Sequence, residues 1–405
     1  MLPNELDSGA DGSDKKSEMR VLALYLPQFH EIAENSQWWG EGYTEWTSVR
    51  NAKPLWRGHI QPRRPLNGEY YDLSDRSGAG LKWQADMASA YGIYGFVIYH
   101  YWFKGKQLLE RPMEILLAHP EIDIKYCICW ANEPWTRTWY GLESKLLIDQ
   151  EYGLQEDWIA HFNYLLKFFK DERYIKVDNK PLVNIYRSAD IDDLESMLAC
   201  WKARAIANGF SGLYVVASNN SKERETRVHL VDAFYNFEPG YSTRNDQGIL
   251  ESFRYFSGIA LKSLLNRLTG LKILERRIDA RRIWRKIVKN YRRNGPGGKI
   301  TYPGLFPMWD NTPRRGYKGM AFTNASPKVF GKTLAALNDM IEAKDFIYIN
   351  AWNEWGEGCY LEPDTATMYA YLEEIASCKG LGKIGEAGFG QMKDAGSNSE
   401  TQGPR

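Results

Sequence analysis

The chain has 405 residues, of which 43% are hydrophobic, so it can bury a large core and fits one large α/β barrel or two ordinary domains. Its formal net charge of +1 gives no whole-chain electrostatic reason to expect nucleic acid as a partner. No stretch approaches the roughly 18 consecutive apolar residues that indicate a membrane-spanning helix.

Cysteine usage and the first residues of the chain indicate the compartment. Five cysteines, an odd number without paired spacing, favour a reducing environment, and the first twenty residues lack the apolar segment of a secretory signal. We therefore expect a cytoplasmic protein.

The chain also carries 15 Trp, 25 Tyr and 16 Phe. Flat aromatic side chains pack in cores and also stack on sugar rings, so this composition permits a carbohydrate ligand.

Eight apolar runs of strand length alternate with amphipathic helical patterns such as 157–174, 190–209 and 326–344. Continuous apolar strands that alternate with helices predict a parallel sheet covered on both faces. Eight repeats favour a closed (β/α)8 TIM-type barrel over an open doubly wound sheet. No run is followed by a dinucleotide or P-loop glycine motif, which also disfavours the open sheet. The runs are 21–29, 94–103, 125–134, 181–187, 213–220, 231–239, 299–311 and 345–355.

Three segments fall outside this alternation. Residues 1–19 and 381–405 are rich in Gly, Ser, Asp and Lys and are predicted to be disordered tails on a barrel domain at 20–380. Residues 250–298 are predicted to be a basic helical insertion between the sixth and seventh strands. It is either a solvated helical hairpin packed on the barrel or an amphipathic helix that contacts an anionic membrane surface or an anionic glycan. Its apolar stripe would consist of Ile278, Ile283, Trp284, Ile287 and Val288.

Polar and aromatic residues gather where the predicted strands end, which is where the active sites of such barrels lie. Each one alone has an ordinary structural explanation; His100, for example, is explained equally well as a core histidine. Their convergence on one rim favours a binding site, with aromatic rings stacking on sugars and polar groups directing hydrogen bonds. Gln28, Tyr99, Tyr186 and Asn220 also lie at strand ends. The candidate substrate-binding residues are Tyr25, His100, Trp102, Trp130, Asn132, Glu133, Tyr235, Trp309, Asn353 and Trp355.

The stretch YINAWNEWGEGCYLEPD at 348–364 places Glu354 and Glu357 three positions apart. Cleavage of a glycosidic bond needs one carboxylic acid to protonate the leaving oxygen and a second carboxylate as base or nucleophile. Residues i and i+3 of a strand point to opposite faces, so both can reach one pocket only if the chain turns at Trp355 and Gly356. We therefore predict that Glu354 and Glu357 are catalytic and face one cleft, about 5 to 9.5 Å apart.

The acidic and cysteine motifs also have other interpretations. Glu354 and Glu357 can be surface residues of a loop, although this leaves the flanking Trp and Gly unexplained. Asn132-Glu133-Pro134 resembles the acid/base triplet of other barrel glycosidases, which makes Glu133 with Glu354 an alternative pair. Cys127 and Cys129 share a strand face without further ligands at zinc spacing, and Asp190-Ile-Asp192 is explained by a helix N-terminus. We therefore expect no metal and no other cofactor.

Four separated motifs, in order, resemble the WbsX-type proteins, often labelled glycosyltransferases of O-antigen and other surface polysaccharide synthesis. The resemblance covers about residues 20–375 and rests on LALYLPQFHEI, YHYWFKGKQLLERP, WANEPWTRTWYG and INAWNEWGEGCYLEPD. That family is in turn similar to glycoside hydrolase family 99, the endo-α-1,2-mannosidases and mannanases, through the barrel, Tyr25 and the N-E-W-x-E-G core.

The resemblance to these hydrolases implies roles for the two glutamates. Glu357 would be the general acid/base, and Glu354 the base that deprotonates the sugar 2-hydroxyl. The reaction would retain configuration through a 1,2-anhydro sugar without a covalent glycosyl-enzyme. Gly356 stands where the mannosidases usually have histidine, and Cys359 and Tyr360 replace a Thr-Gln pair.

Together these observations predict a retaining enzyme that cleaves or transfers glycosidic bonds in surface polysaccharide metabolism. A sugar-nucleotide-dependent glycosyltransferase of lipopolysaccharide biosynthesis and a catalytically silent glycan-binding barrel are the alternatives. The expected partner is an oligosaccharide or polysaccharide, free or lipid-linked, and no nucleic acid. Residues 250–298 would provide a peripheral contact with the inner membrane face.

Overall fold

The structure is a computed structural model that describes residues 19–136, 146–220, 224–244, 249–274, 276–382 and 384; of residues 244 and 249–256 it describes the backbone only. The predicted tails at 1–19 and 381–405 lie almost entirely outside the described residues. Within the described part, no helix is long and apolar enough to cross a membrane.

Parallel strands pair into a closed ring at the centre of the fold. In the described part of the chain they are β1 (Arg20–Tyr25), β2 (Ile93–Phe103), β4 (Lys125–Trp130), β8 (Lys180–Ile185), β9 (Tyr214–Asn219), β10 (Ala233–Asn236), β12 (Ile300–Tyr302), β13 (Gly304–Leu305) and β15 (Phe346–Ile349). They pair in the order β12-β10-β9-β8-β4-β2-β1-β15-β13. Because β12 and β13 are separated only by Pro303, whose carbonyl accepts from Tyr348 N at 2.9 Å, one segment closes the ring. The fold is the TIM-type (β/α)8 barrel that the sequence predicts.

Side chains fill the interior of the barrel and leave no pore. The rings of Tyr235 and Tyr348 stack with centroids 4.4 Å apart. The Tyr348 hydroxyl donates to Asn184 Oδ1 at 2.9 Å, and Asn184 Nδ2 donates to the Ile128 carbonyl at 2.9 Å. Because these buried polar groups are paired, they add specificity to an otherwise apolar core without an unsatisfied donor.

Helices cover the outside of the ring because their apolar residues recur on one face. In α6, for example, His161, Phe162, Leu165 and Phe169 are buried at helical spacing. The covering helices are α4 (Ala79–Ala90), α5 (Arg111–Ala118), α6 (Gln155–Phe169), α7 (Leu194–Ala207), α10 (Ala280–Asn290), α12 (Pro327–Asp339) and α13 (Ala370–Cys378).

The remaining elements lie mainly in the connections between the barrel strands and the covering helices. The helices are α2 (Ala33–Trp39), α3 (Glu45–Asn51), α8 (Gly240–Arg244), α9 (Ile249–Thr269) and α11 (Thr312–Arg315). The strands are β3 (Lys106–Leu108), β5 (Trp135–Thr136), β6 (Leu146–Ile148), β7 (Lys176–Val177), β11 (Arg276–Asp279), β14 (Met320–Thr323), β16 (Asn353–Glu354) and β17 (Cys359–Tyr360). The 3-10 turns are η1 (Leu66–Gly68), η3 (Ser188–Asp190), η4 (Val228–Leu230), η5 (Pro296–Gly298), η6 (Gly316–Lys318) and η7 (Trp355–Glu357).

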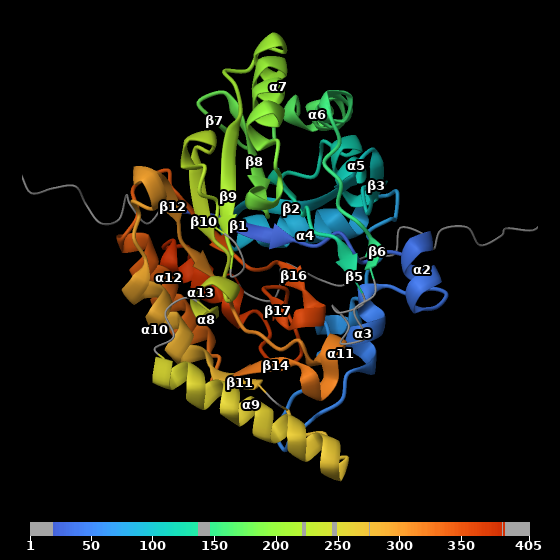
Figure 1. Cartoon of the computed structure of the whole chain (residues 1–405), viewed down its shortest axis with the longest axis vertical. Coiled ribbons are helices and arrows are strands. Elements are labelled where there is room, and N and C mark those ends of the chain that lie inside the picture. Colours follow the sequence, from blue (N-terminus) through green and yellow to red (C-terminus); the bar gives the residue numbers. More distant parts are fainter. Residues whose placement is uncertain are drawn as a thin grey trace, which may run out of the picture.

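The structure divides the predicted insertion at 250–298 into two parts. Helix α10 belongs to the barrel wall: Ile283, Trp284 and Ile287 are buried, and Trp284 Nε1 donates to the Phe306 carbonyl at 3.0 Å. Helix α9 is peripheral and carries exposed leucines. In Figure 1 it runs along the lower edge of the molecule, far from α6 and α7 at the top. The extra structure is therefore α9 with β11, which pairs with β14.

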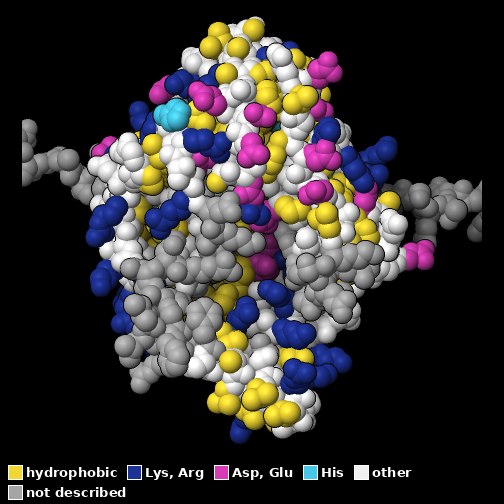
Figure 2. All heavy atoms as spheres, in the orientation of Figure 1, with side chains coloured by type: hydrophobic (Ala, Val, Ile, Leu, Met, Phe, Trp, Pro, Cys, Tyr) yellow, Lys and Arg dark blue, Asp and Glu magenta, His cyan; other side chains and the backbone are white. Residues whose placement is uncertain are grey.

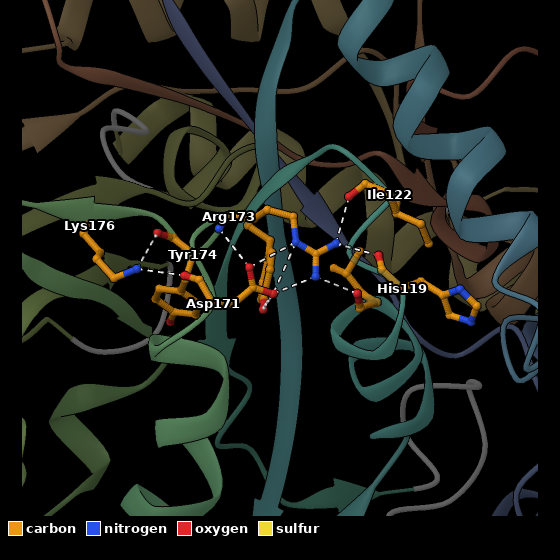
Figure 3. A network of polar contacts seen from close by, with 8 residues as sticks. His119, Ile122, Asp171, Arg173, Tyr174 and Lys176 are labelled. Carbon is orange, nitrogen blue, oxygen red and sulfur yellow. Dashed lines mark hydrogen bonds and ion pairs between the residues drawn. The ribbon is translucent and has the colours of Figure 1, made fainter. Parts of the chain in front are cut away.

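An arginine network fastens the amino-terminal end of the barrel (Figure 3). The Arg173 guanidinium donates to the carbonyls of Leu116, His119 and Ile122 at 2.8 to 2.9 Å and forms an ion pair with Asp171 at 2.6 Å. It thereby adds a charged donor to the Leu116 carbonyl in the last turn of α5 and to two carbonyls of the loop that follows the helix. These residues precede β4 and β8, at the end of the barrel opposite the usual site, so their contribution is to stability.

Because α10 is buried and α9 is exposed, truncation of a side chain to alanine should lower the free energy of unfolding more in α10 than in α9. Trp284 is 1% exposed, so Trp284→Ala should destabilise the fold by about 3–5 kcal/mol. Leu268 in α9 is 73% exposed, so Leu268→Ala should change stability by no more than about 0.5 kcal/mol. Denaturant unfolding of both variants measures the difference, and equal shifts of the two midpoints would contradict this assignment of α10.

Candidate active site

A cavity of about 470 Å³ lies at the carboxyl ends of the barrel strands. The face in Figure 2 is hollowed near its middle, where acidic side chains are visible, with Lys and Arg side chains below them. The cavity is lined by Tyr99 and Tyr101 of β2, by segments that follow the other barrel strands, and by residues of β11 and β14, so the chain converges on it from most of its length. Glu133, Trp309, Glu354 and Glu357 from the predicted set are among the lining residues.

A short hairpin after β15 carries the two glutamates. Strand β16 pairs antiparallel with β17, and between them η7 is followed by Gly358 at φ 55°. This left-handed conformation favours glycine, and a Cβ there would lie 2.9 Å from the Asp310 carbonyl. The turn brings Glu354 and Glu357 to the same cavity although they are three residues apart.

Buried hydrogen bonds hold this hairpin in place. Glu362 accepts hydrogen bonds from Trp355 Nε1 at 2.6 Å, Gln84 Nε2 at 2.6 Å and the Tyr71 hydroxyl at 2.9 Å. Burial raises the pKa of Glu362 to about 7, although these three donors lower it. Asn353 bonds both backbone groups of Leu26, accepting from the nitrogen at 2.7 Å and donating to the oxygen at 3.0 Å. The hairpin is thus attached to the end of β1 and to the α4 helix.

Arg314 contacts three carboxylates at the floor of the cavity. Its Nε lies 2.7 Å from Glu45 Oε1, Nη2 lies 2.7 Å from Glu354 Oε1, and Nη1 lies 3.2 Å from Glu357 Oε1. Side-chain exposure rises from 1% for Glu45 to 10% for Glu354 and 27% for Glu357. Glu357 is therefore the carboxylate most open to a ligand, and Glu354 lies deeper.

The protonation of this cluster follows from its charges. Burial raises the pKa of Glu354 well above its usual range; Arg314 lowers it, and the carboxylates of Glu357 and Glu45 raise it further. Burial also raises the pKa of Glu357, against a lowering by Arg314. Since one guanidinium cannot neutralise all of the negative charge around it, burial and mutual repulsion favour a proton on the Glu354 and Glu357 pair at a higher pH than on isolated glutamates.

Gly356 provides the space in which this cluster forms. A Cβ on Gly356 would overlap the Glu45 carboxylate and lie 2.6 Å from Arg314 Nε. Any side chain at this position would therefore displace Glu45 from Arg314. The Glu45–Arg314 ion pair therefore depends on the absence of a side chain at position 356.

The structure corrects the positions of eight predicted substrate-binding residues, which are buried and do not line the cavity. Strand alternation is the reason in β2: Tyr99 and Tyr101 face the cavity, whereas His100 and Trp102 face α6, where His161 lies. Burial lowers the pKa of His100 to about 3, so this histidine is a neutral core residue. The eight are Tyr25, His100, Trp102, Trp130, Asn132, Tyr235, Asn353 and Trp355.

Each of the remaining buried residues has an identifiable structural partner. The Tyr25 hydroxyl donates to Gln84 at 2.6 Å, and Asn132 Nδ2 donates to the Arg187 carbonyl at 2.8 Å. Trp130 packs edge-on against His161 with centroids 4.7 Å apart. Glu133, which does line the cavity, forms an ion pair with Arg187 at 3.3 Å.

Several residues that line the cavity are not among the predicted substrate-binding residues. The aromatic wall consists of Tyr99, Tyr101, Tyr186, Phe237 and Trp309. These rings can stack on a sugar, but of the predicted aromatic residues only Trp309 is among them. The charged groups that sequence reasoning missed are Glu45, Arg276, Arg314 and Arg315. The available signal was the Arg-Arg pair that follows Trp309-Asp310 by a few residues at a strand end.

The part of the chain that the structure describes contains no group of three or more His, Cys, Asp or Glu residues placed to hold a metal ion. Cys127 and Cys129 are buried, and burial raises the pKa of Cys129 to about 12. Asp190 forms an ion pair with Arg187 Nε at 2.7 Å. These groups therefore have structural roles.

The fit of Gly356 against Glu45 predicts a large effect from a single methyl group. Gly356→Ala should destabilise the protein by about 1–3 kcal/mol, because overpacking at this site must move the Glu45–Arg314 pair. Gly382→Ala is the matched control, since a Cβ there meets nothing within 4 Å. In a Glu45→Ala background the cost of Gly356→Ala should shrink, and an unchanged cost in this double-mutant cycle of unfolding free energies would refute the coupling.

Comparisons with solved structures agree with the barrel fold. The fold resembles a glycoside hydrolase-like protein (TM-score 0.56, 14% identity, covering 92% of this chain and 97% of the other). It also resembles the GH99 endo-alpha-mannosidase from Bacteroides thetaiotaomicron (TM-score 0.51, 13% identity, covering 89% and 96%). At such identities the likeness concerns the fold alone.

Sequence relatives define the family. The protein WxcX from two strains of Xanthomonas campestris pv. campestris is 34% identical over 358 residues, which are 87% of this chain. The chain spans about half the length of these relatives, since the match covers 48% of WxcX. The family described as "Glycosyltransferase WbsX" matches residues 21–375. The chain therefore belongs to the WbsX glycosyltransferase family.

Proposed function

We propose that this protein is a carbohydrate-active enzyme that cleaves or transfers glycosidic bonds, with retention of configuration, in surface polysaccharide or O-antigen metabolism. The main support is the position of Glu354 and Glu357, which reach one aromatic-lined cavity from one turn and share the guanidinium of Arg314. Paired carboxylates beside stacking surfaces are what glycosidic chemistry requires. The ligand is an oligosaccharide or polysaccharide, free or lipid-linked.

Different exposure suggests different roles for the two carboxylates. Glu357, with 27% of its side chain exposed, donates a proton to the leaving oxygen. Glu354, 10% exposed and 2.7 Å from Arg314 Nη2, removes the proton from the sugar 2-hydroxyl. The 2-oxygen then attacks the anomeric carbon as the glycosidic bond breaks, which gives a 1,2-anhydro sugar.

The second half-reaction restores both carboxyl groups. Glu357 takes a proton from an incoming hydroxyl, which attacks the anomeric carbon and opens the anhydro ring, and Glu354 returns its proton to the 2-oxygen. Two inversions give net retention. Water as the incoming group gives hydrolysis, and a sugar hydroxyl gives transfer, so the same residues serve both outcomes.

Arg314 supports both roles by opposing the effect of burial. It lowers the pKa of Glu354 and of Glu357, which burial raises, and it holds the two side chains in place. Without the guanidinium, three carboxylates close together would take up protons or move apart. Glu354 could then no longer act as a base.

Substitution of the glutamates tests this mechanism. Glu357→Gln keeps the shape but cannot transfer the proton, so turnover should fall by about 10² to 10⁴ while substrate binding largely survives. Glu354→Gln should also abolish turnover, and a substrate without the 2-hydroxyl should not react. Product analysis with a panel of free and lipid-linked glycans, with and without sugar nucleotides, is the measurement. Glu133→Gln is the comparison, because Glu133 lines the same cavity.

The same assay distinguishes the proposed mechanism from the alternative functions, because each one predicts a different result. A sugar-nucleotide-dependent glycosyltransferase, which the family description favours, would need a nucleotide donor. Activity that requires such a donor, is lost with EDTA and is indifferent to both Glu substitutions would overturn the proposed chemistry. Glycan binding with no turnover of any substrate would indicate a catalytically silent barrel. Loss of activity in Glu133→Gln with retention in Glu357→Gln would move the acid/base to Glu133.

We further propose that α9 and the residues after it contact the cytoplasmic face of a membrane. Large apolar side chains are exposed here, next to the basic residues Lys262, Arg267 and Lys272. An apolar face flanked by cations matches a membrane surface with anionic lipids. The exposed apolar residues are Leu261 (60%), Leu264 (52%), Leu265 (39%), Leu268 (73%), Leu271 (54%) and Ile273 (37%).

Vesicle binding tests this contact. The protein should sediment with phosphatidylglycerol vesicles more strongly than with phosphatidylcholine vesicles, and Leu264→Ser with Leu268→Ser should reduce binding at least about tenfold, given roughly 25 cal/mol per Å² of apolar surface. Leu146→Ser with Leu154→Ser is the matched control, since these leucines are 53% and 71% exposed elsewhere on the surface. Equal loss in both double variants, or no binding by the unaltered protein, would contradict the proposal.

A further inference from the structure

Two arginines in the cavity wall form no direct ion pair within the described part of the chain. Among the described residues, neither Arg276 nor Arg315 forms an ion pair, whereas the adjacent Arg314 contacts three carboxylates. Arg315 Nε is buried and has no hydrogen-bond partner within the described part of the chain. A buried donor on a charged group costs free energy when it has no hydrogen-bond partner, and a ligand that accepts from it removes this cost.

The two side chains are brought together by separate elements. Arg276 begins β11 and lies opposite Met320 of β14 in the parallel pair, and Met320 also lines the cavity. Arg315 ends α11 and is the residue after Arg314. Burial lowers the pKa of Arg315, and the positive charge of Arg276 lowers it further, so the two guanidinium groups repel each other. Two like charges therefore face the same space.

We propose that Arg276 and Arg315 form a subsite for a phosphate or diphosphate group carried by the saccharide substrate. The inference rests on the proposed function, because it places this anion in the cavity that holds Glu354 and Glu357. Guanidinium groups bind phosphate oxygens through paired, charge-assisted hydrogen bonds. A phosphate or diphosphate with two negative charges relieves the repulsion between both arginines, whereas a single carboxylate can neutralise only one.

The subsite has a consequence for which bond reacts. Arg315 interacts electrostatically with Glu357, so the phosphate binds close to the acid/base carboxyl. The reacting sugar is thus one whose phosphate lies near the scissile bond, as in a saccharide attached to a diphosphate. Such a diphosphate has two sources, a lipid-linked glycan or a sugar nucleotide, and both present the same charged group to the two arginines.

Calorimetric binding measurements test the subsite without requiring turnover. The probes are inorganic pyrophosphate, a sugar 1-phosphate and the corresponding neutral methyl glycoside. The sugar 1-phosphate should bind at least about tenfold more tightly than the glycoside, since a hydrogen bond to a charged group contributes about 1.5–3 kcal/mol. Arg276→Gln and Arg315→Gln should each remove about tenfold of the affinity for both phosphate probes and leave glycoside binding unchanged.

A matched control separates the subsite from general charge effects. Lys318→Gln removes one positive charge three residues after Arg315, from an exposed side chain that does not line the cavity, and should leave every affinity unchanged. Arg315→Lys keeps the charge and should restore part of the affinity. Unchanged thermal midpoints verify that the variants fold. Equal binding of the sugar 1-phosphate and the glycoside, or an equal loss in Lys318→Gln, overturns the inference.

Two further ligands identify the source of the phosphate. A nucleoside diphosphate that binds more tightly than pyrophosphate, with the same dependence on Arg276 and Arg315, supports the subsite and assigns it to a sugar nucleotide. Tighter binding of a short-chain polyprenyl diphosphate supports it and assigns it to a lipid-linked glycan. The result is distinguishable from failure of the proposed function: turnover that survives both Glu substitutions refutes the carboxylate mechanism, whereas phosphate affinity independent of both arginines refutes only the subsite.

Discussion

The interaction on which the site depends is the contact of one buried guanidinium with three carboxylates. Arg314 is only 4% exposed, and its nitrogens lie 2.7 to 3.2 Å from Glu45, Glu354 and Glu357. These residues come from α3, from α11 and from the hairpin after β15. A buried ion cluster costs desolvation energy and contributes little net stability, but removal of one member leaves an uncompensated charge. The cluster therefore fixes the relative positions of three distant segments more than it strengthens the fold.

The requirement for this cluster explains features that otherwise look unrelated. Gly356 has no side chain because Glu45 and Arg314 occupy the space, and Gly358 provides the left-handed turn that returns the chain to β17. Glu362 is buried beneath the hairpin with three donors, so the turn cannot move without breaking these hydrogen bonds. The glycines and the buried acid thus serve the same purpose, which is a fixed geometry for two carboxylates that share a cavity.

The sequence predicts the barrel and the turn that carries Glu354 and Glu357, because both leave local signals. Apolar runs that alternate with helical periodicity predict the ring of strands, and the glycines between Glu354 and Tyr360 indicate a turn. The sequence does not show which face of a strand points into the cavity. In β2 a shift by one residue exchanges Tyr99 and Tyr101 for His100 and Trp102, and both sets are aromatic and polar. Arg314 and Glu45 lie 269 positions apart, so no local pattern connects them.

The segment between β10 and β14 adds positive charge to the cavity and an apolar surface outside it. The carboxylates and most of the aromatic wall come from outside this segment. The segment contributes Arg276 and Arg315 to the cavity wall and the exposed apolar residues of α9 to the surface. Helix α9 ends at Thr269 and β11 begins at Arg276, so a short connection joins the exposed leucines to the cavity. Leu274 within this connection is buried, and Arg277 lies over the Trp56 ring at 4.5 Å, which anchors it to the barrel. A substrate with an apolar anchor, a phosphate and a sugar chain would meet the exposed leucines, the two arginines and the aromatic wall in that order. One such substrate would therefore explain both the proposed membrane contact and the proposed phosphate subsite.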